Sequence, residues 1–116
     1  MTTIAPINPS EAARAAGALE GPDFDSWAAR FELLSDPNRL RILHCLHHMA
    51  DLCVTDLAAA VRMSPTSVSQ ALRLLRQHGW VAATKDGRAV RYHLTDDTAH
   101  SLLHAMGAVH GVGHTH

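Results

Sequence analysis

Histidine is the residue type with the most obvious chemical use in this sequence. The 116-residue chain contains ten histidines, far above ordinary usage. On a helix of 3.6 residues per turn, Asp97, His100 and His104 fall within about 60° of one another and form one polar face. Neutral imidazole together with carboxylate is a donor set that suits zinc, nickel or cobalt. The other interpretation is a solvated helix end, or a nonspecific chelating tail at His114 and His116.

The two cysteines, Cys45 and Cys53, offer a different chemistry. Two cysteines in a chain of this length imply no disulfide scaffold. A thiol switch would need both side chains to converge across a turn between two helices. Cys45 also fits the simpler role of a small buried hydrophobic residue. Asp56 fits a cap for the helix that begins near Val54.

A polar helical face follows these groups along the chain. Ser64 is placed to cap a helix that begins at Pro65, where the missing N–H costs nothing. Solubility alone normally uses Lys and Glu on an exposed face, whereas this one carries hydroxyls, an amide and an arginine. These types suit the major groove of DNA, where Gln addresses adenine, Arg guanine, and Ser or Thr a base or phosphate. The candidate DNA-reading residues are Ser64, Thr66, Ser67, Ser69, Gln70 and Arg73, with Val68, Leu72 and Leu75 as the apolar stripe.

A basic hairpin comes after this helix. Residues 80–84 and 89–94 are β-type runs joined by residues 85–88, and Asp-Gly between such runs is a strong hairpin signal. Lys85 and Arg88 lie at the tip, and Arg91 lies on the returning strand. A hairpin of this kind beside a polar recognition helix predicts a winged helix-turn-helix, with the wing reaching phosphates or the minor groove.

Positive charge is concentrated in this part of the chain. The formal net charge is −1, which taken alone would argue against a nucleic-acid partner. Between residues 62 and 91, however, six residues are basic and only Asp86 is acidic. This local balance is the electrostatic footprint expected of a surface that binds nucleic acid.

Several other classes of protein are not expected. The sequence has no His-Glu-x-x-His, no serine or cysteine nucleophile motif and no glycine-rich phosphate loop, so neither an enzyme nor an organic cofactor is indicated. It has no charged leader with an apolar core and no apolar run long enough to span a bilayer. A cytoplasmic protein without a membrane partner is the default. A metal buffer would not need the polar helix and the basic wing.

The remaining segments predict one domain between two ends. Residues 1–22 should form an arm with a short helix capped by Ser10, residues 23–110 the winged domain, and residues 111–116 a histidine-containing tail. An aromatic amphipathic helix is expected over residues 24–34, with part of its face packed on a partner subunit. The fold class is therefore mainly α with a two-stranded β wing.

Two further helices complete the prediction. One should begin at Asp36-Pro37 by the same cap-then-proline logic. Its inward stripe is Leu40, Leu43 and Leu46, with Ile42 and Met49 flanking it. The last helix should follow a cap at Thr95, and Gly111 should end it. Its stripe is Leu102, Leu103, Met106 and Val109.

With these elements placed, residues 24–109 resemble the ArsR/SmtB family of metal-responsive bacterial repressors. The resemblance is carried, in the expected order, by residues 34–43, 52–58, 64, 67–69, 72–73, 75–76 and 87–94. It implies a homodimer joined by the first and last helices, with two recognition helices addressing a two-fold operator in double-stranded DNA. In this family, metal binding usually weakens the DNA complex.

The resemblance also implies two candidate metal sites. Cys53 and Asp56 stand where relatives place a thiolate and a carboxylate, but residues 1–43 contain no Cys or His to complete that set. Replacements lie nearby in Cys45 and in three histidines of the preceding helix, His44, His47 and His48.

The second site lies on the last helix. Asp97 and His110 keep the family's thirteen-residue separation, while Ala99 and Gly113 replace two expected ligands. His100 and His114 are each displaced by one position. The predicted function is a metal-sensing repressor released by nickel, cobalt or zinc. The alternative is a regulator of the same fold with a cysteine redox switch or without an effector.

Overall fold

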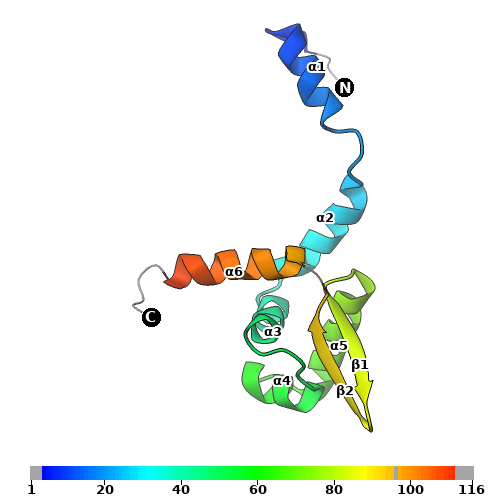
Figure 1. Ribbon diagram of the computed structural model, residues 1–116, viewed down its shortest axis with the longest axis vertical. Coiled ribbons are helices and arrows are strands. Elements are labelled where there is room, and N and C mark those ends of the chain that lie inside the picture. The colour runs from blue at the N-terminus through cyan, green and yellow to red at the C-terminus, as the bar shows by residue number, and fades with distance from the viewer. Residues whose placement is uncertain (1–3, 96, 112–116) are drawn as a thin grey trace.

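Six helices and a two-stranded hairpin make up the fold, as the sequence predicts (Figure 1). The computed structural model describes residues 4–95 and 97–111, the last four of them by their backbone only. The elements are α1 (Pro9–Gly17), α2 (Phe24–Glu32), the short 3-10 helix η1 (Leu33–Ser35), α3 (Pro37–His48), α4 (Val54–Val61), α5 (Pro65–Gln77), β1 (Val81–Asp86), β2 (Ala89–Leu94) and α6 (Asp97–Gly111).

Side-chain caps determine where several helices begin. The Asp36 carboxylate accepts the Asn38 N–H at 3.1 Å, which confirms the predicted start of α3. The prediction for α1 was wrong by two residues. Asn8, rather than Ser10, accepts the Glu11 N–H at 3.1 Å, so Pro9 becomes the first helical residue.

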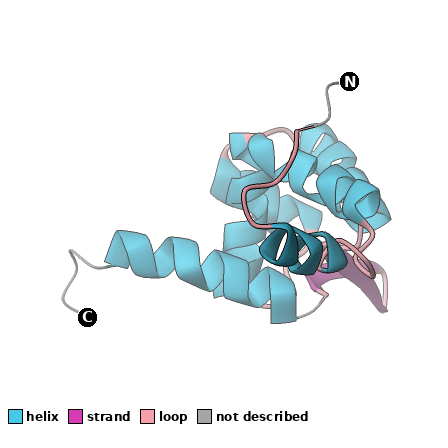
Figure 2. Cartoon of the chain, turned by 90° about the horizontal axis from the view of Figure 1, so that it is seen from above, coloured by secondary structure: helices cyan, strands magenta, loops and turns pink. Residues whose placement is uncertain are grey.

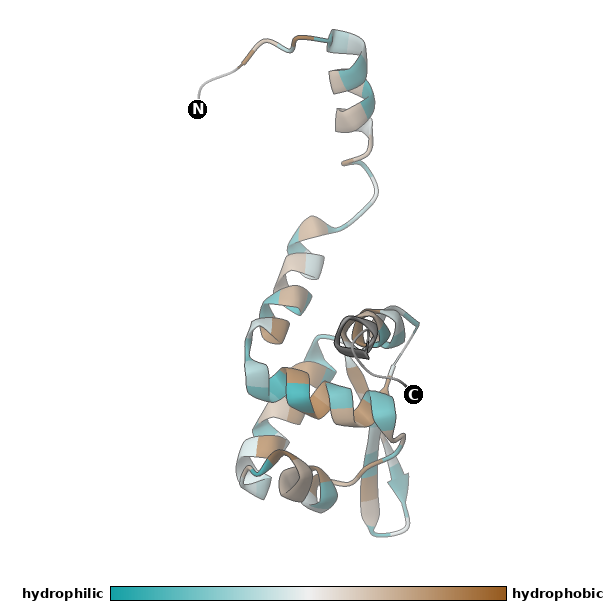
Figure 3. Cartoon of the chain, turned by 90° about the vertical axis from the view of Figure 1, so that its left-hand side faces the viewer, coloured by the Kyte–Doolittle hydropathy of each residue, from teal (hydrophilic) through white to brown (hydrophobic). Residues whose placement is uncertain are grey.

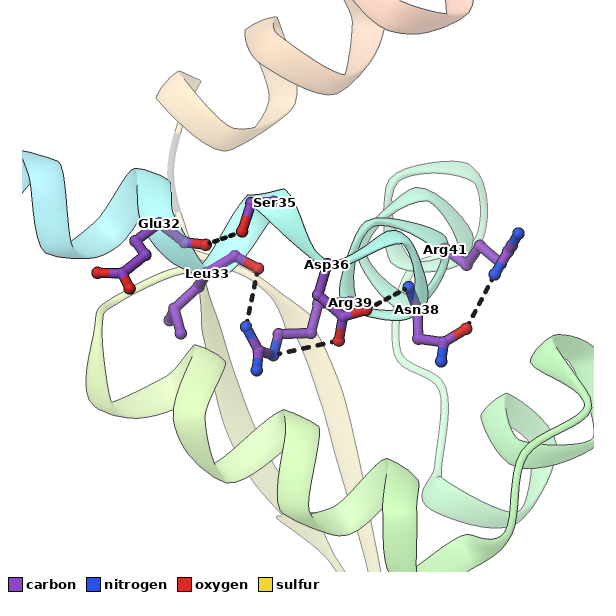
Figure 4. A network of polar contacts seen from close by, with 7 residues as sticks. All are labelled: Glu32, Leu33, Ser35, Asp36, Asn38, Arg39 and Arg41. Carbon is purple, nitrogen blue, oxygen red and sulfur yellow. Dashed lines mark hydrogen bonds and ion pairs between the residues drawn. The ribbon is translucent and has the colours of Figure 1, made fainter.

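The junction between η1 and α3 is tied by polar contacts (Figure 4). The Arg39 guanidinium donates to the Leu33 carbonyl at 3.2 Å and lies 3.6 Å from the Asp36 carboxylate. The Ser35 hydroxyl donates to the Glu32 carbonyl at 2.7 Å. Arg39 thereby fixes the direction in which α3 leaves α2.

The hydrophobic core lies where α3, α4, α5, the wing and α6 meet. The predicted stripe of α5 is fully buried, and Leu57 and Ala58 supply the buried face of α4. The prediction for α3 was partly wrong, because Ile42 is fully buried while Leu40 is half-buried and Met49 is 59% exposed. Several neighbouring elements contact α3 from different sides. More of its circumference is therefore buried than a single stripe of residues. In α6, Leu103 and Ala99 are buried.

The wing is an antiparallel hairpin with a two-residue turn. Val81 pairs with Leu94 at its base and Asp86 with Ala89 at its tip. The turn is therefore Gly87-Arg88, with Lys85 and Asp86 still in the strand rather than in the loop as predicted. Gly87 has φ of 62°, the positive value that the first position of a type II′ turn requires. Backbone bonds between Leu52 and Tyr92 add a short third segment beside β2.

The two ends of the chain lie away from this core. Every residue from 4 to 26 is exposed, and α1 stands apart from the other helices (Figures 1 and 3). The helix α6 extends beyond the domain (Figures 1 and 2). The division at residues 22 and 23 stays a prediction, and most of the predicted tail, residues 112–116, lies outside the described residues.

Trp80 connects α2 to the wing. Its indole is only 1% exposed and donates from Nε1 to the Arg30 carbonyl at 2.8 Å. The Arg30 guanidinium lies 4.4 Å from the ring centres of both Trp80 and Trp27 and donates to the Gly79 carbonyl at 3.2 Å. These cation–π contacts and hydrogen bonds join the first helix of the domain to the segment that follows α5.

We expect Trp80→Phe to destabilise the fold by about 2–3 kcal/mol, because it removes this hydrogen bond and leaves a cavity in the core. Trp27→Phe is the matched control. Its ring is half-buried, so its cost should be about 1 kcal/mol or less. Urea denaturation at one fixed protein concentration measures both. Equal losses in the two variants would contradict this role for Trp80.

Candidate functional site

The helices α4 and α5 form the predicted helix-turn-helix. Arg62 ends α4 in the left-handed region, with φ of 59°, and its N–H donates to the Ala58 carbonyl. The Ser64 hydroxyl accepts the Ser67 N–H at 3.0 Å and donates to the Ser67 hydroxyl at 2.9 Å. Ser64 is therefore the cap of α5, and its hydroxyl orients that of Ser67.

The outer face of α5 is available to a ligand. Val68, Leu72 and Leu75 have no exposed surface, so they fix the rotation of the helix. The opposite side chains are all exposed, namely Thr66, Ser67, Ser69, Gln70 and Arg73. Among the described residues, neither Gln70 nor Arg73 has a hydrogen-bond or ion-pair partner. On this face the Ser64 and Ser67 hydroxyls bond to each other, so within the described part of the chain Gln70 and Arg73 are the long polar side chains without internal competition.

The basic residues of the wing divide into two kinds. Lys85 and Arg88 are exposed at the tip and have no carboxylate partner within the described part of the chain. Arg91 is engaged internally, because its guanidinium lies 3.4 Å from the Asp86 carboxylate and donates to the Asp51 carbonyl at 3.0 Å. Within the described residues, two of the three predicted wing residues therefore have no internal ion-pair partner, and the third supports the hairpin.

Histidines of α3 and α6 meet where these helices pack. The Nδ1 atoms of His47 and His100 are 3.4 Å apart, and their ring centres are 5.5 Å apart. The ring of His104 lies 6.2 Å from that of His47. His44 and His48 extend the cluster along α3. Sequence reasoning assigned His100 and His104 to the last-helix site but did not place His47 beside them.

His47 is the electrostatic centre of this cluster. Partial burial, and then the neighbouring imidazoles with His100 first, lower the pKa of His47. A lowered pKa keeps the imidazole neutral, which is the form that binds metals. In residues 4–95 and 97–107 no three His, Cys, Asp or Glu side chains already form a metal-binding group.

The structure describes the other predicted ligands of α6 to different extents. Asp97 is exposed at the first turn of the helix. His110 lies on α6, but its side chain is outside the described residues, as are His114 and His116 entirely. The predicted last-helix site is therefore described only at its N-terminal half.

At the predicted cysteine site, the structure brings Cys53 and Asp56 together. The Cys53 thiol lies 3.3 Å from the Asp56 carboxylate at the start of α4. Cys45 is half-buried on α3, and both cysteines are free thiols. Burial raises the pKa of the Cys45 thiol, which lowers its thiolate fraction at neutral pH. A hollow next to Asp56 is lined by Cys45 and by the histidines His44 and His48.

An apolar surface runs along α2 next to the start of α6. Phe24 and Phe31 are 53% and 47% exposed, although both are large hydrophobic residues. Together with Pro22, Trp27, Ala28 and Thr98 they line a shallow hollow. Exposed aromatic groups gathered in this way are a common feature of surfaces that bind another protein.

Comparison with known proteins agrees with the helix-turn-helix and wing described above. The family described as "Bacterial regulatory protein, arsR family" matches residues 36–83. The cadmium resistance transcriptional regulatory protein CadC of Listeria innocua is 38% identical over 88 residues, which cover 76% of this chain and 74% of that protein. A transcriptional repressor SmtB homolog of Synechocystis is 43% identical over 72 residues, covering 62% of this chain and 54% of that protein.

A solved structure shows the same fold. The homodimeric winged helix-turn-helix DNA-binding domain of Mb0332 from Mycobacterium bovis has a TM-score of 0.69 at 24% identity, covering 84% of this chain and 98% of that one. Among the described residues, no helix is long and apolar enough to cross a bilayer. The relatives are transcriptional regulators rather than enzymes. The chain belongs to the ArsR family of bacterial regulatory proteins.

Proposed function

We propose that this protein is a homodimeric repressor that binds operator DNA and leaves it when nickel, cobalt or zinc binds. The observation that carries the DNA-binding part is the exposed polar face of α5, where Gln70 and Arg73 have no partner among the described residues, next to the exposed Lys85 and Arg88 of the wing. Gln70 and Arg73 would read base edges in the major groove, while Lys85 and Arg88 would contact phosphates. Ser64 and Arg91 hold the reading elements in place.

The proposed dimer uses the apolar surface of α2 together with α6. Exposed Phe24 and Phe31 would be covered by the same elements of a second chain, which gives a two-fold axis and two half-sites. The homodimeric state of the Mycobacterium bovis domain supports this assembly.

The proposed effector site lies on α6. Asp97 and His100, with His104 on the same face, would bind the metal together with His110, His114 or His116 from the partner chain or the tail. The cadmium resistance named for the Listeria relative supports a response to metal, but a soft cation of that kind favours thiolates. This chain has only two cysteines against ten histidines, so borderline metals fit it better.

A redox response has less support. A thiol switch requires a reactive thiolate, whereas burial raises the pKa of Cys45. Cys53 keeps its carboxylate neighbour Asp56 and lacks further ligands among the N-terminal residues. Metal binding at histidines is therefore the better explanation of the unusual composition.

For DNA binding, Arg73→Ala should lower operator affinity by about 1–3 kcal/mol and relax sequence preference, because a base contact is lost. Arg88→Ala should weaken all DNA sequences alike and reduce the salt slope by about one counterion. Arg14→Ala on α1 makes the same charge change away from α5 and the wing and should have little effect. Fluorescence anisotropy across salt concentrations measures all three variants. Unchanged operator binding by both test variants would contradict the proposed docking.

For assembly, Phe24→Glu should convert a dimer at micromolar concentration into a monomer, because it places a charge on the apolar surface. Val90→Glu is the control, since Val90 is a 40% exposed hydrophobic residue on the wing. Sedimentation velocity without added metal distinguishes the two states. A wild-type protein that sediments as a monomer would overturn the proposed interface.

For the effector, nickel, cobalt or zinc should weaken operator binding by about 5–150-fold, the usual range of allosteric coupling. The double variant His100→Ala/His110→Ala should lose this response, as should truncation after Val112 if the tail contributes ligands. His78→Ala, at the end of α5, is the control. Wild-type DNA affinity that is unchanged by every metal would refute the metal response. Metal affinity that is unchanged in the double variant would refute this site.

A further inference from the structure

The contact between α3 and α6 brings together residues far apart in the chain. His47 and His100 are 53 positions apart, yet their Nδ1 atoms are 3.4 Å from each other. His100 and His104 are both exposed, and His47 is half-buried beneath them. No backbone bond or cap requires imidazoles at this place, so the cluster needs a physical explanation of its own.

The separation of the two nitrogens distinguishes between explanations. A nitrogen donor in a good hydrogen bond lies about 2.7–3.2 Å from its acceptor, which is shorter than the observed 3.4 Å. Two nitrogen ligands on a tetrahedral zinc ion, each about 2.0–2.1 Å from the metal, lie about 3.3–3.4 Å apart. The pair has the spacing of two ligands of one ion.

A third ligand is within reach. His104 lies one helical turn after His100 on the same face of α6, and its ring centre is 6.2 Å from that of His47. Because the His104 side chain is exposed, it can change rotamer without disturbing the core. Water or the Asp97 carboxylate, one turn before His100, can fill a fourth position.

We propose that His47 is a metal ligand, and that His47, His100 and His104 form a zinc-, cobalt- or nickel-binding site that bridges α3 and α6 within one protomer. This inference deepens the proposed function, on which it rests in taking α6 as the effector-binding helix. It keeps His100 and His104 of that site and replaces the ligands from the partner chain or the tail by His47, from the body of the DNA-binding domain.

A bridge at this place connects the two parts that an allosteric effector must couple. The helix α3 packs against α4, α5 and β2, which together form the reading unit. The helix α6 belongs to the proposed dimer interface. An ion bound by both His47 and His100 would fix the angle between α3 and α6. It would thereby fix the spacing of the two α5 helices in the dimer. It shifts DNA binding to the extent that it prefers one of these geometries.

The test is metal binding by the full-length protein, measured by chelator competition with zinc and by the visible absorption of the cobalt form. His47→Gln should weaken zinc affinity by at least about 10–100-fold, the range seen even for residues that only support a ligand. His48→Gln is the matched control, because His48 is the next residue of α3 and is exposed. It should retain wild-type affinity and the wild-type cobalt spectrum.

Two further measurements keep the result interpretable. The metal-free variants should show the same circular dichroism and thermal unfolding as the wild type, since both positions lie at the surface of α3. At the same zinc concentration, the melting temperature of the wild type should rise more than that of His47→Gln, because the wild type binds the ion more tightly in the folded state.

The outcomes separate this inference from the proposed function. If the wild type binds zinc and His47→Gln binds it equally well, the bridge is wrong while the metal response stands. If His110→Gln abolishes binding and His47→Gln does not, the ion lies between subunits and the bridge is again wrong. If the wild type binds none of the three metals, both proposals fail. Selective loss in His47→Gln, with His48→Gln unchanged, supports the bridge.

Discussion

The buried indole of Trp80 is the contact on which the arrangement of this molecule depends. It lies directly between the end of α5 and the start of β1, and its Nε1–H reaches back across fifty residues to the Arg30 carbonyl. The Arg30 guanidinium covers its face and that of Trp27. A single side chain thereby sets the positions of the helix proposed to bind a second subunit, of the recognition helix and of the wing. The position of each of these three elements therefore depends on the positions of the other two.

The polar surface of the reading unit follows from what its apolar side must do. Val68, Ala71, Leu72 and Leu75 are buried, and their burial turns the side chains on the opposite face of α5 outward. The Ser64 cap then fixes where the helix starts, and so which residues lie at its exposed N-terminal turn. On the wing, the pairing of Arg91 with Asp86 uses one arginine for support and leaves Arg88 unpaired at the tip. Which side chains are exposed for the proposed recognition thus depends on how the apolar side chains pack, as well as on their own chemistry.

Local signals made much of this fold predictable, and long-range contacts account for what was missed. The cap-and-proline pairs at Asp36-Pro37 and Ser64-Pro65 act over three residues, so a sequence displays them directly. The burial of Ile42 depends on how many neighbours surround α3, which no periodicity within α3 records. The meeting of His47 with His100 depends on where α6 crosses α3. The sequence showed an excess of histidine on two helices, but only their crossing shows which of these residues face each other.

The short backbone pairing of Leu52 with Tyr92 has a mechanical consequence. Two hydrogen bonds, of 3.1 and 2.8 Å, join β2 to the segment before α4, so the hairpin is held from both sides near its base. Beyond this point the Arg91 side chain still reaches the Asp51 carbonyl, and among the described residues only β1 is paired with β2 by backbone as far as the turn at Gly87. Near its base, β2 thus has backbone partners on both edges, whereas toward the tip it is paired on one edge only. In the proposed complex, this would let Arg88 follow a phosphate whose position varies with local groove width while α5 keeps its register, and tolerance of DNA shape would be greater at the flanks of a site than at its centre.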